Sequence, residues 1–169
     1  KSQLLAGRFK LSQIARTQTL SGTGAVNLAY SLVQTFYKDF DGKVWTSNPT
    51  WPIHNTMAKL MGFEAKSYFY YDLEKREFDS RKYIGSLKGI PERSFIVLHC
   101  SGHNPTGYDV SDEEWKEIAQ ICKQRGYIVL MDTAYQGFVT GDLMKDGYPI
   151  RLMAENGVPL LIAQSYAKN

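Results

Sequence analysis

Two short apolar runs on either side of one long helical pattern constrain the fold of this chain more than any other feature. The runs, SFIVLH at residues 94–99 and YIVLMD at residues 127–132, have uninterrupted apolar centres, as expected for strands that are covered on both faces. Residues 111–126 between them combine a capping box, formed by Ser111 and Glu114, with an apolar stripe and a final glycine, which predicts a helix. Strand, helix and strand in this order predict two parallel strands.

The same alternation extends along the rest of the chain. After the SGTG segment, apolar residues recur with helical spacing from position 25 to position 36, which predicts a helix that runs to about Phe40. The pattern predicts an α/β fold with three layers, α/β/α, in which helices cover both faces of a mainly parallel sheet. Further strands are predicted at residues 15–20, 43–47, 66–72 and 159–164, and a further helix at residues 54–62.

Composition narrows the classes of function. The chain has 169 residues, and 20 Lys and Arg against 17 Asp and Glu leave a net charge of only +3, too little to indicate a nucleic-acid partner. No apolar run approaches the roughly 18 residues of a membrane-spanning helix, so no membrane partner is expected. Cys100 and Cys122 lack CxxC spacing, and the three histidines show no metal-binding pattern, so neither a disulfide framework nor a metal site is predicted.

Polar residues directly follow four of the predicted strands. His99 ends one strand, Asp132 ends the next, residues 165–168 follow the last one, and SNPTW at residues 47–51 follows the strand at 43–47. Ligands of parallel α/β sheets bind outside the carboxyl ends of the strands. We therefore expect these residues to converge at one edge of the sheet.

The segment LSGTGA has the composition of a phosphate-binding turn. Its small residues lead directly into a predicted helix, so backbone N–H groups and the hydroxyls of Ser21 and Thr23 would face an anion. A tight turn with a helix N-cap is the alternative. The segment is not a Walker loop, since no GK[ST] follows, and it is not the dinucleotide fingerprint, since the third glycine is missing. A nucleotide-binding domain is therefore disfavoured.

Asp132 and Lys168 are the candidates for charged chemistry. An acid at the end of a buried strand is costly unless it is paired, which indicates an N-cap, a salt bridge, or a carboxylate that holds a proton on a heteroaromatic nitrogen. Tyr135 could donate to a ring oxygen or be an ordinary half-buried tyrosine. Lys168 lies just past a buried strand in a turn of small residues, where desolvation would lower its pKa and free its amine to form an imine. An ordinary surface lysine is the alternative.

Three further side chains could complete such a site. Trp51 lies on a predicted loop, where it could stack on a flat ring, or it could belong to the core. His54 and His99 could support Asp132 and tune its charge, or they could be structural. A phosphate cradle, an acid for a ring nitrogen, a stacking aromatic and an imine lysine together indicate one cofactor, pyridoxal 5′-phosphate.

Five motifs in this order and spacing resemble those of one family. SGTGA, NPTWPIH, LHCSGHNPTG, DTAYQGF and QSYAKN are similar to the motifs of the aspartate aminotransferases, which are class I, fold-type I pyridoxal-phosphate-dependent enzymes. The resemblance covers essentially the whole chain. It implies the large-domain fold of these enzymes. It also implies transamination between L-aspartate or L-glutamate and 2-oxo acids (2-oxoglutarate or oxaloacetate), by a ping-pong mechanism through a Lys168 aldimine.

The resemblance also implies roles for the residues nearest the chemistry. Lys168 forms the imine and carries the proton between Cα and the cofactor C4′. Asp132 keeps the pyridine nitrogen protonated. Tyr135 and Asn104 bind the phenolic oxygen of the ring, and Trp51 stacks on it. Trp51 and Asn104 also contact the substrate, and Asn104 does so at its carboxylate.

The remaining motif residues have supporting roles by the same resemblance. His54 and His99 support Asp132, and no role is assigned to His103. Four residues are implied to bind the cofactor phosphate: Ser21, Gly22, Thr23 and Ser165.

Members of the family continue past the imine lysine, with arginines that bind phosphate and substrate carboxylates, and they are homodimers with shared sites. We therefore interpret residues 1–169 as part of a large cofactor-binding domain, without the small domain and the C-terminal part, from a cytoplasmic or mitochondrial-matrix enzyme. Two alternatives stay open. One is an aromatic amino acid aminotransferase, which shares most of these motifs, and the other is an inactive, truncated fragment that binds pyridoxal phosphate.

Overall fold

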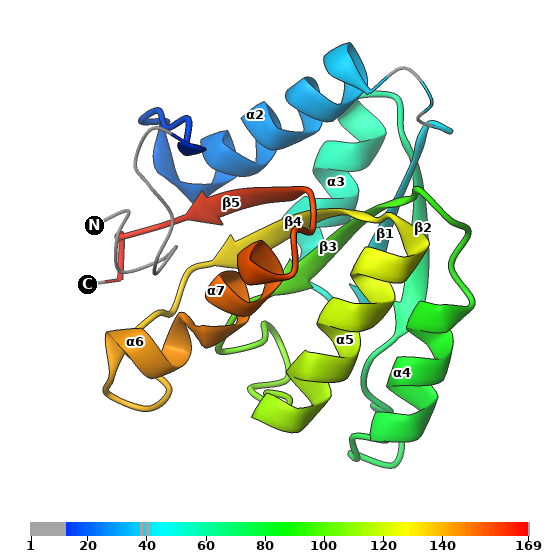
Figure 1. Ribbon diagram of the computed structural model, residues 1–169, viewed down its shortest axis with the longest axis vertical. Coiled ribbons are helices and arrows are strands. Elements are labelled where there is room, and N and C mark those ends of the chain that lie inside the picture. The colour runs from blue at the N-terminus through cyan, green and yellow to red at the C-terminus, as the bar shows by residue number, and fades with distance from the viewer. Residues whose placement is uncertain (1–12, 38, 40, 169) are drawn as a thin grey trace.

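The computed structural model describes residues 13–37, 39 and 41–168, in which five strands form a sheet (Figure 1). The strands lie in the order β2-β1-β3-β4-β5, and every neighbouring pair is parallel. The predicted parallel sheet is thus confirmed. The strands are β1 (Lys43–Asn48), β2 (Glu64–Phe69), β3 (Phe95–His99), β4 (Ile128–Thr133) and β5 (Leu160–Gln164).

Helices cover both faces of this sheet, which confirms the three-layer arrangement (Figure 1). One face carries α2 (Ser21–Phe36) and α3 (Pro52–Leu60). The short α6 (Leu143–Asp146) leads into α7 (Tyr148–Glu155). The other face of the sheet carries α4 (Ser80–Lys88), α5 (Asp112–Arg125) and α7.

Among the residues described, no helix combines the length and the apolarity needed to cross a membrane.

Two hydrophobic cores, one on each face of the sheet, hold the layers together. On the α2 side, the Tyr30 ring meets the Phe95 ring edge-on, with centroids 5.4 Å apart. On the α5 side, Ile118 and Ile96 are fully buried. Phe95 and Ile96 are neighbours in β3 and point into different cores, which explains why the run is apolar without interruption. Each fully buried side chain of this size contributes about 1.5–3 kcal/mol to stability.

α5 begins and ends where its sequence signals predict. The Ser111 hydroxyl accepts the backbone N–H of Glu114, and the Glu114 carboxylate accepts the backbone N–H of Ser111, so the capping box is confirmed. Gly126 follows the last turn. The predicted apolar stripe is the buried face of the helix, formed by Trp115, Ile118, Ala119 and Cys122.

Four predictions about elements differ from the structure. The helix predicted at residues 54–62 is α3, which begins at Pro52, a residue suited to the first helical position, and ends at Leu60. α2 ends at Phe36 rather than near Phe40, because Tyr37 leaves the helical conformation with φ −95° and ψ 88°. Residues 15–20 form no strand, since the sheet ends at β2 on one side and at β5 on the other. β2 spans residues 64–69 instead of 66–72, because the chain turns beyond it and Asp72 forms an isolated antiparallel bridge with Glu77.

Three helices, α4, α6 and α7, were not predicted from the sequence. The charged stretch at residues 72–82 indicates solvated surface, and residues 73–77 are exposed. However, the Asp79 carboxylate accepts the backbone N–H of Lys82 and starts α4. Tyr83 and Leu87 of α4 are buried against the sheet. A nine-residue helix offers too few turns for its apolar periodicity to stand out among these charges.

Candidate active site

The carboxyl ends of the strands border a cavity of about 250 Å³, a size that suits a small organic ligand rather than a macromolecule. The start of α2 and the segments that follow β1, β3, β4 and β5 all line it. The sequence-based expectation that these segments converge therefore holds in the structure. The lining includes ten of the predicted site residues: Ser21, Gly22, Thr23, Trp51, His99, Asn104, Asp132, Tyr135, Ser165 and Lys168.

The first turn of α2 presents backbone N–H groups at this cavity. Leu20, at the N-cap, makes no side-chain hydrogen bond to them, and no acidic side chain lies in the first turn. Ser21 has a φ of 63°, a conformation that is costly for a residue with a side chain and that occurs at ligand sites. An uncapped N-terminus of a 16-residue helix favours an anion through its N–H groups and its dipole.

A close approach brings the segment after β5 against the start of α2. A Cβ on Gly22 would lie only 3.2 Å from the Cβ of Ser165, so the absence of a side chain at Gly22 lets the two segments meet. The backbone N–H of Ser165 donates to the carbonyl of Thr133 at 3.0 Å, which extends the β4–β5 pairing. The Ser165 side chain and the α2 N–H groups therefore border the same corner of the cavity.

Asp132, at the end of β4, is held by His54 from α3. His54 Nε2 lies 3.0 Å from Asp132 Oδ2, and the two side chains are 0% and 11% exposed. A buried carboxylate without such a partner would be costly. The pairing therefore satisfies one face of the carboxylate, while its remaining exposed part lines the cavity.

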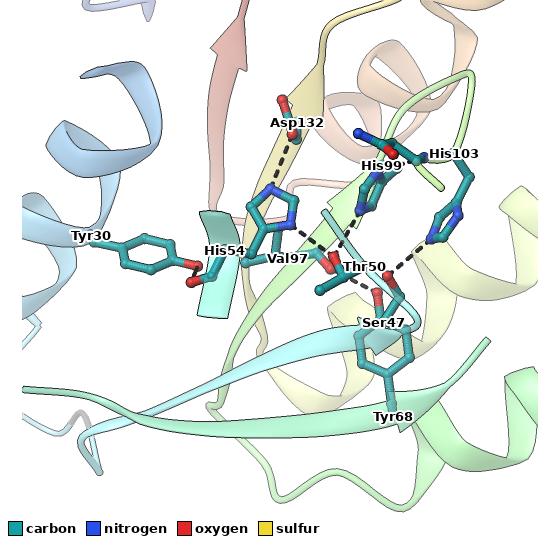
Figure 2. Close-up of polar contacts among 10 residues, drawn as sticks. Tyr30, Ser47, Thr50, His54, Tyr68, Val97, His99, His103 and Asp132 are labelled. Carbon is teal, nitrogen blue, oxygen red and sulfur yellow. Dashed lines mark hydrogen bonds and ion pairs between the residues drawn. The ribbon is translucent and has the colours of Figure 1, made fainter. Parts of the chain in front are cut away.

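A chain of hydrogen bonds runs behind Asp132 (Figure 2). The backbone N–H of Asn104 donates to His99 Nδ1 at 3.4 Å, so the proton of the neutral His99 ring lies on Nε2. That Nε2–H donates to Thr50 Oγ1 at 3.1 Å, and the Thr50 hydroxyl forms a hydrogen bond with His54 Nδ1 at 2.8 Å. A carboxylate can only accept, so His54 carries a proton on Nε2 and donates it to Asp132. The Asn104 N–H thus fixes the tautomer of His99, and Asp132 places a proton on His54 Nε2.

Thr50 is the link in this chain that the sequence analysis missed. It precedes His54 by four residues and follows the predicted strand, so its place in the turn was visible, but its contacts with two histidines depend on how β1, α3 and β3 pack. His54 does not line the cavity, whereas His99 does, and both lie behind or beside Asp132 as predicted. Their functional role stays a prediction.

His99 is held neutral by its surroundings. Burial lowers the pKa of His99 well below its usual value, and the neighbouring His103 and His54 lower it further, while Asp132 partly opposes them. The rings of His54 and His99 meet edge-on, with centroids 5.1 Å apart. A neutral His99 is what the tautomer assignment requires, because a protonated ring could not accept the Asn104 N–H.

Lys168 and Tyr135 lie next to each other in the lining of the cavity. Lys168 Nζ lies 4.5 Å from the centroid of the Tyr135 ring, a cation–π distance. Lys168 is exposed, so the expectation that it is desolvated is wrong for this chain: few residues of the described segments cover the turn that carries it. A Cβ on Gly102 would lie 2.9 Å from Tyr135 Cβ. Gly102, which the sequence analysis did not single out, therefore lets the tyrosine pack closely.

Within the described ranges, no group of three His, Cys, Asp or Glu side chains is arranged to hold a metal ion. The histidines are instead engaged with one another and with hydroxyl groups (Figure 2).

Acid is expected to destabilise the fold through His103. Burial, and next the nearby His54, lowers the pKa of His103 to about 3, whereas an unfolded histidine titrates near 6.5. Between these values the unfolded state binds the extra proton, so stability falls as pH drops below about 6.5. From pH 7 to pH 5 the loss is about 2 kcal/mol for this group. Urea titrations of wild type and His103→Gln at both pH values measure it, and equal pH dependence in the two proteins would contradict the prediction.

Comparison with known proteins places the chain in a family. The family described as aminotransferase class I and II matches residues 2–169, so the chain belongs to it. It is 39% identical to the cytoplasmic aspartate aminotransferase of Schizosaccharomyces pombe, over 93% of this chain and 39% of that protein. It is 37% identical to the mitochondrial aspartate aminotransferase of Gallus gallus, over 95% of this chain and 38% of that protein. The chain thus spans about two fifths of the length of these relatives.

Solved structures agree with this assignment. The broad specificity aminotransferase from Leishmania mexicana superposes with a TM-score of 0.91 at 34% identity, over 98% of this chain and 42% of that one. An aromatic amino acid aminotransferase from Burkholderia cenocepacia superposes with a TM-score of 0.88 at 32% identity, over 98% of this chain and 42% of that one. The fold predicted from the sequence, that of fold-type I aminotransferases, is therefore confirmed.

Proposed function

We propose that this chain forms part of the cofactor-binding large domain of a pyridoxal-phosphate-dependent aminotransferase that acts on aspartate and glutamate. The observation that carries the proposal is the convergence of Asp132, backed by the His54 chain, with Lys168 and the uncapped start of α2 on one cavity. A lone acid, lysine or helix start would not indicate this chemistry, whereas the combination matches the distinct ends of one cofactor.

The residues present fit pyridoxal phosphate. The first turn of α2 with Ser21, Gly22 and Thr23, together with Ser165, would hold the phosphate. Asp132 would pair with the pyridine nitrogen, and Trp51 would stack on the ring. Two further side chains that line the cavity, Asn104 and Tyr135, would bind the phenolic oxygen. When bound, the cofactor supplies an electron sink for the carbanion that forms at the substrate Cα.

Around the bound cofactor and substrate, side chains of this chain would hold the reacting groups in place and transfer protons. His54 donates to Asp132 and holds the carboxylate in place, where its charge would favour a proton on the ring nitrogen. The exposed Lys168 has an amine that can react with an aldehyde and can move the proton at the substrate Cα. Asn104 would also contact the substrate carboxylate. Trp51 would shield the opposite side of the ring from water.

Borohydride trapping tests the cofactor and the lysine together. The protein that carries this chain is incubated with pyridoxal phosphate, reduced, digested and mapped by mass. We expect one label, on Lys168, because this lysine lines the cavity. Matched reduction of a Lys123→Ala variant, which removes an exposed lysine of α5, should give the same label. Label scattered over surface lysines, or absent from a folded protein, would contradict the proposal.

Aspartate is the proposed substrate because two relatives are named as aspartate aminotransferases at 37–39% identity. An aromatic amino acid aminotransferase is the second candidate, since one superposes with a TM-score of 0.88. We expect kcat/KM for aspartate to exceed that for phenylalanine when each is measured with 2-oxoglutarate. A clear preference for phenylalanine would favour the second candidate.

The proposal extends to the whole protein. We expect a homodimer, as in the family that the motifs resemble. The relatives include a cytoplasmic and a mitochondrial enzyme, and both compartments are therefore candidates. An inactive fragment that binds the cofactor without turnover is distinguished by labelling of Lys168 in a protein that does not transaminate either amino acid.

A further inference from the structure

His103 is a buried histidine that the proposed reaction does not use. It is 2% exposed, and it does not line the cavity. Both of its ring nitrogens nevertheless have partners: Nε2 lies 3.0 Å from Ser47 Oγ, at the end of β1, and Nδ1 lies 2.9 Å from Thr106 Oγ1 (Figure 2 shows the Ser47 contact). Its ring stacks on Tyr70, with centroids 3.7 Å apart and an interplanar angle of 14°.

One side of the His103 ring reaches the end of β1. Ser47, the partner of His103 Nε2 at 3.0 Å, is 2% exposed and belongs to β1, so the hydrogen bond joins His103 to a residue whose position the sheet fixes. A neutral imidazole offers one donor and one acceptor, and the hydroxyls of Ser47 and Thr106 can complement either tautomer.

The other ring nitrogen closes the loop that follows β3. The Thr106 hydroxyl oxygen accepts the backbone N–H of Tyr108 at 3.2 Å and also forms the hydrogen bond with His103 Nδ1. The backbone N–H of Gly107 donates to the carbonyl of His103 at 2.7 Å. His103 thus closes the turn that runs to Tyr108 with two contacts, one from its backbone carbonyl and one from its side chain.

Two further contacts make this loop a compact unit. The Asp109 carboxylate accepts the backbone N–H groups of Gly102 at 2.7 Å and of His103 at 2.9 Å. The Tyr70 hydroxyl donates to the carbonyl of Tyr108 at 2.5 Å. The loop is therefore tied to itself by Asp109, and it is tied to the sheet through the His103–Ser47 bond and through Tyr70.

We propose that His103 is a positioning residue, which anchors the loop to β1 so that Asn104, the next residue, stays at the cavity. The inference rests on the proposed function, in which Asn104 binds the phenolic oxygen of the cofactor and the substrate carboxylate. Asn104 is also the residue whose backbone N–H starts the hydrogen-bond chain to Asp132. A shift of the loop would thus disturb both ligand contacts, while Asp132 keeps its direct partner His54.

Two substitutions separate the hydrogen bonds of His103 from its volume. His103→Phe keeps a ring that can stack on Tyr70 but loses both hydrogen bonds, whereas His103→Gln keeps an amide that can donate to or accept from Ser47. In the full protein, we expect His103→Phe to raise KM for aspartate and Kd for pyridoxal phosphate roughly tenfold. kcat should change by no more than about threefold, because the groups that move protons are retained. His103→Gln should recover most of the affinity.

A second variant and a stability control keep the inference testable if His103→Phe folds poorly. Ser47→Ala removes only the partner hydroxyl and should raise KM in the same direction. Gly126→Ala places a side chain at a φ of 64° at the C-cap of α5, just before the amino end of β4, and should lower the melting temperature with KM unchanged. Equal KM values in wild type, His103→Phe and Ser47→Ala would overturn the inference, and so would an equal rise of KM in Gly126→Ala.

Hydrogen exchange gives a readout that does not depend on the cofactor. Without any ligand, peptides that cover residues 99–109 should exchange faster in His103→Phe and Ser47→Ala than in wild type, while peptides of α5 stay unchanged. Faster exchange without binding of pyridoxal phosphate by wild type would support the anchor but refute the proposed function. Binding by wild type with unchanged exchange in both variants would refute the anchor alone.

Discussion

Replacing Lys168 with alanine in the protein that carries this chain is expected to lower the transamination rate by at least about 10⁴-fold, because one amine both reacts with the cofactor and moves the proton at Cα. No other lysine lines the cavity among the described residues, so none is placed to replace it. Lys168 is exposed, and the free energy of unfolding should therefore change by less than about 0.5 kcal/mol. Steady-state kinetics and urea titration measure the two effects.

Lys168→Arg is the matched variant for this test. It keeps the positive charge that lies near the Tyr135 ring, but a guanidinium is not deprotonated in proteins and cannot act as a nucleophile or base. The arginine variant should therefore be as inactive as the alanine variant. If Lys168→Arg kept more than a small share of the wild-type rate, the charge rather than the amine would be the contribution of this residue.

Substitution of Asp132 should have the second largest effect. Asp132→Ala is expected to lower kcat about 10³-fold, since it removes the charge that favours a protonated ring nitrogen. It also leaves the buried Nε2–H of His54 without its acceptor 3.0 Å away. Stability should therefore fall by about 1–3 kcal/mol as well. Kinetics of the loaded enzyme and the free energy of unfolding without cofactor report the two losses separately.

Asp132→Asn separates the charge from the hydrogen bond. Its amide oxygen can still accept from His54, so we expect stability near that of wild type, but a neutral amide does not favour the ring proton and the rate should stay low. Asp39→Asn, at a side chain that is 73% exposed, is the control for loss of a carboxylate. An Asp132→Asn enzyme with a nearly normal rate would show that the charge of Asp132 has no part in the reaction.

The local pattern was sufficient to predict elements whose signals are contained within their own residues. The capping box of α5, its apolar stripe and the runs of β3 and β4 are examples, because propensity, capping and burial there agree over a continuous segment. α4 and α7 escaped prediction because each is at most nine residues long and gains its stability from packing against the sheet. Residues 15–20 have strand-like composition, but a strand also requires a partner, which only the assembled sheet can supply.

The candidate site also contains residues that the sequence indicates and contacts that only the tertiary structure reveals. Asp132, His99 and Lys168 could be proposed from the sequence because each directly follows an apolar strand, and the ends of parallel strands meet at one edge. The contact of Thr50 with two histidines and the anchoring of His103 by Ser47 and Tyr70 were decided only by the tertiary structure. These contacts join side chains from segments distant in sequence, and such distances are set by how helices and strands pack, which no local pattern specifies. The sequence alone determined which chemical groups reach the cavity, and the fold decided which partners hold each of them in place.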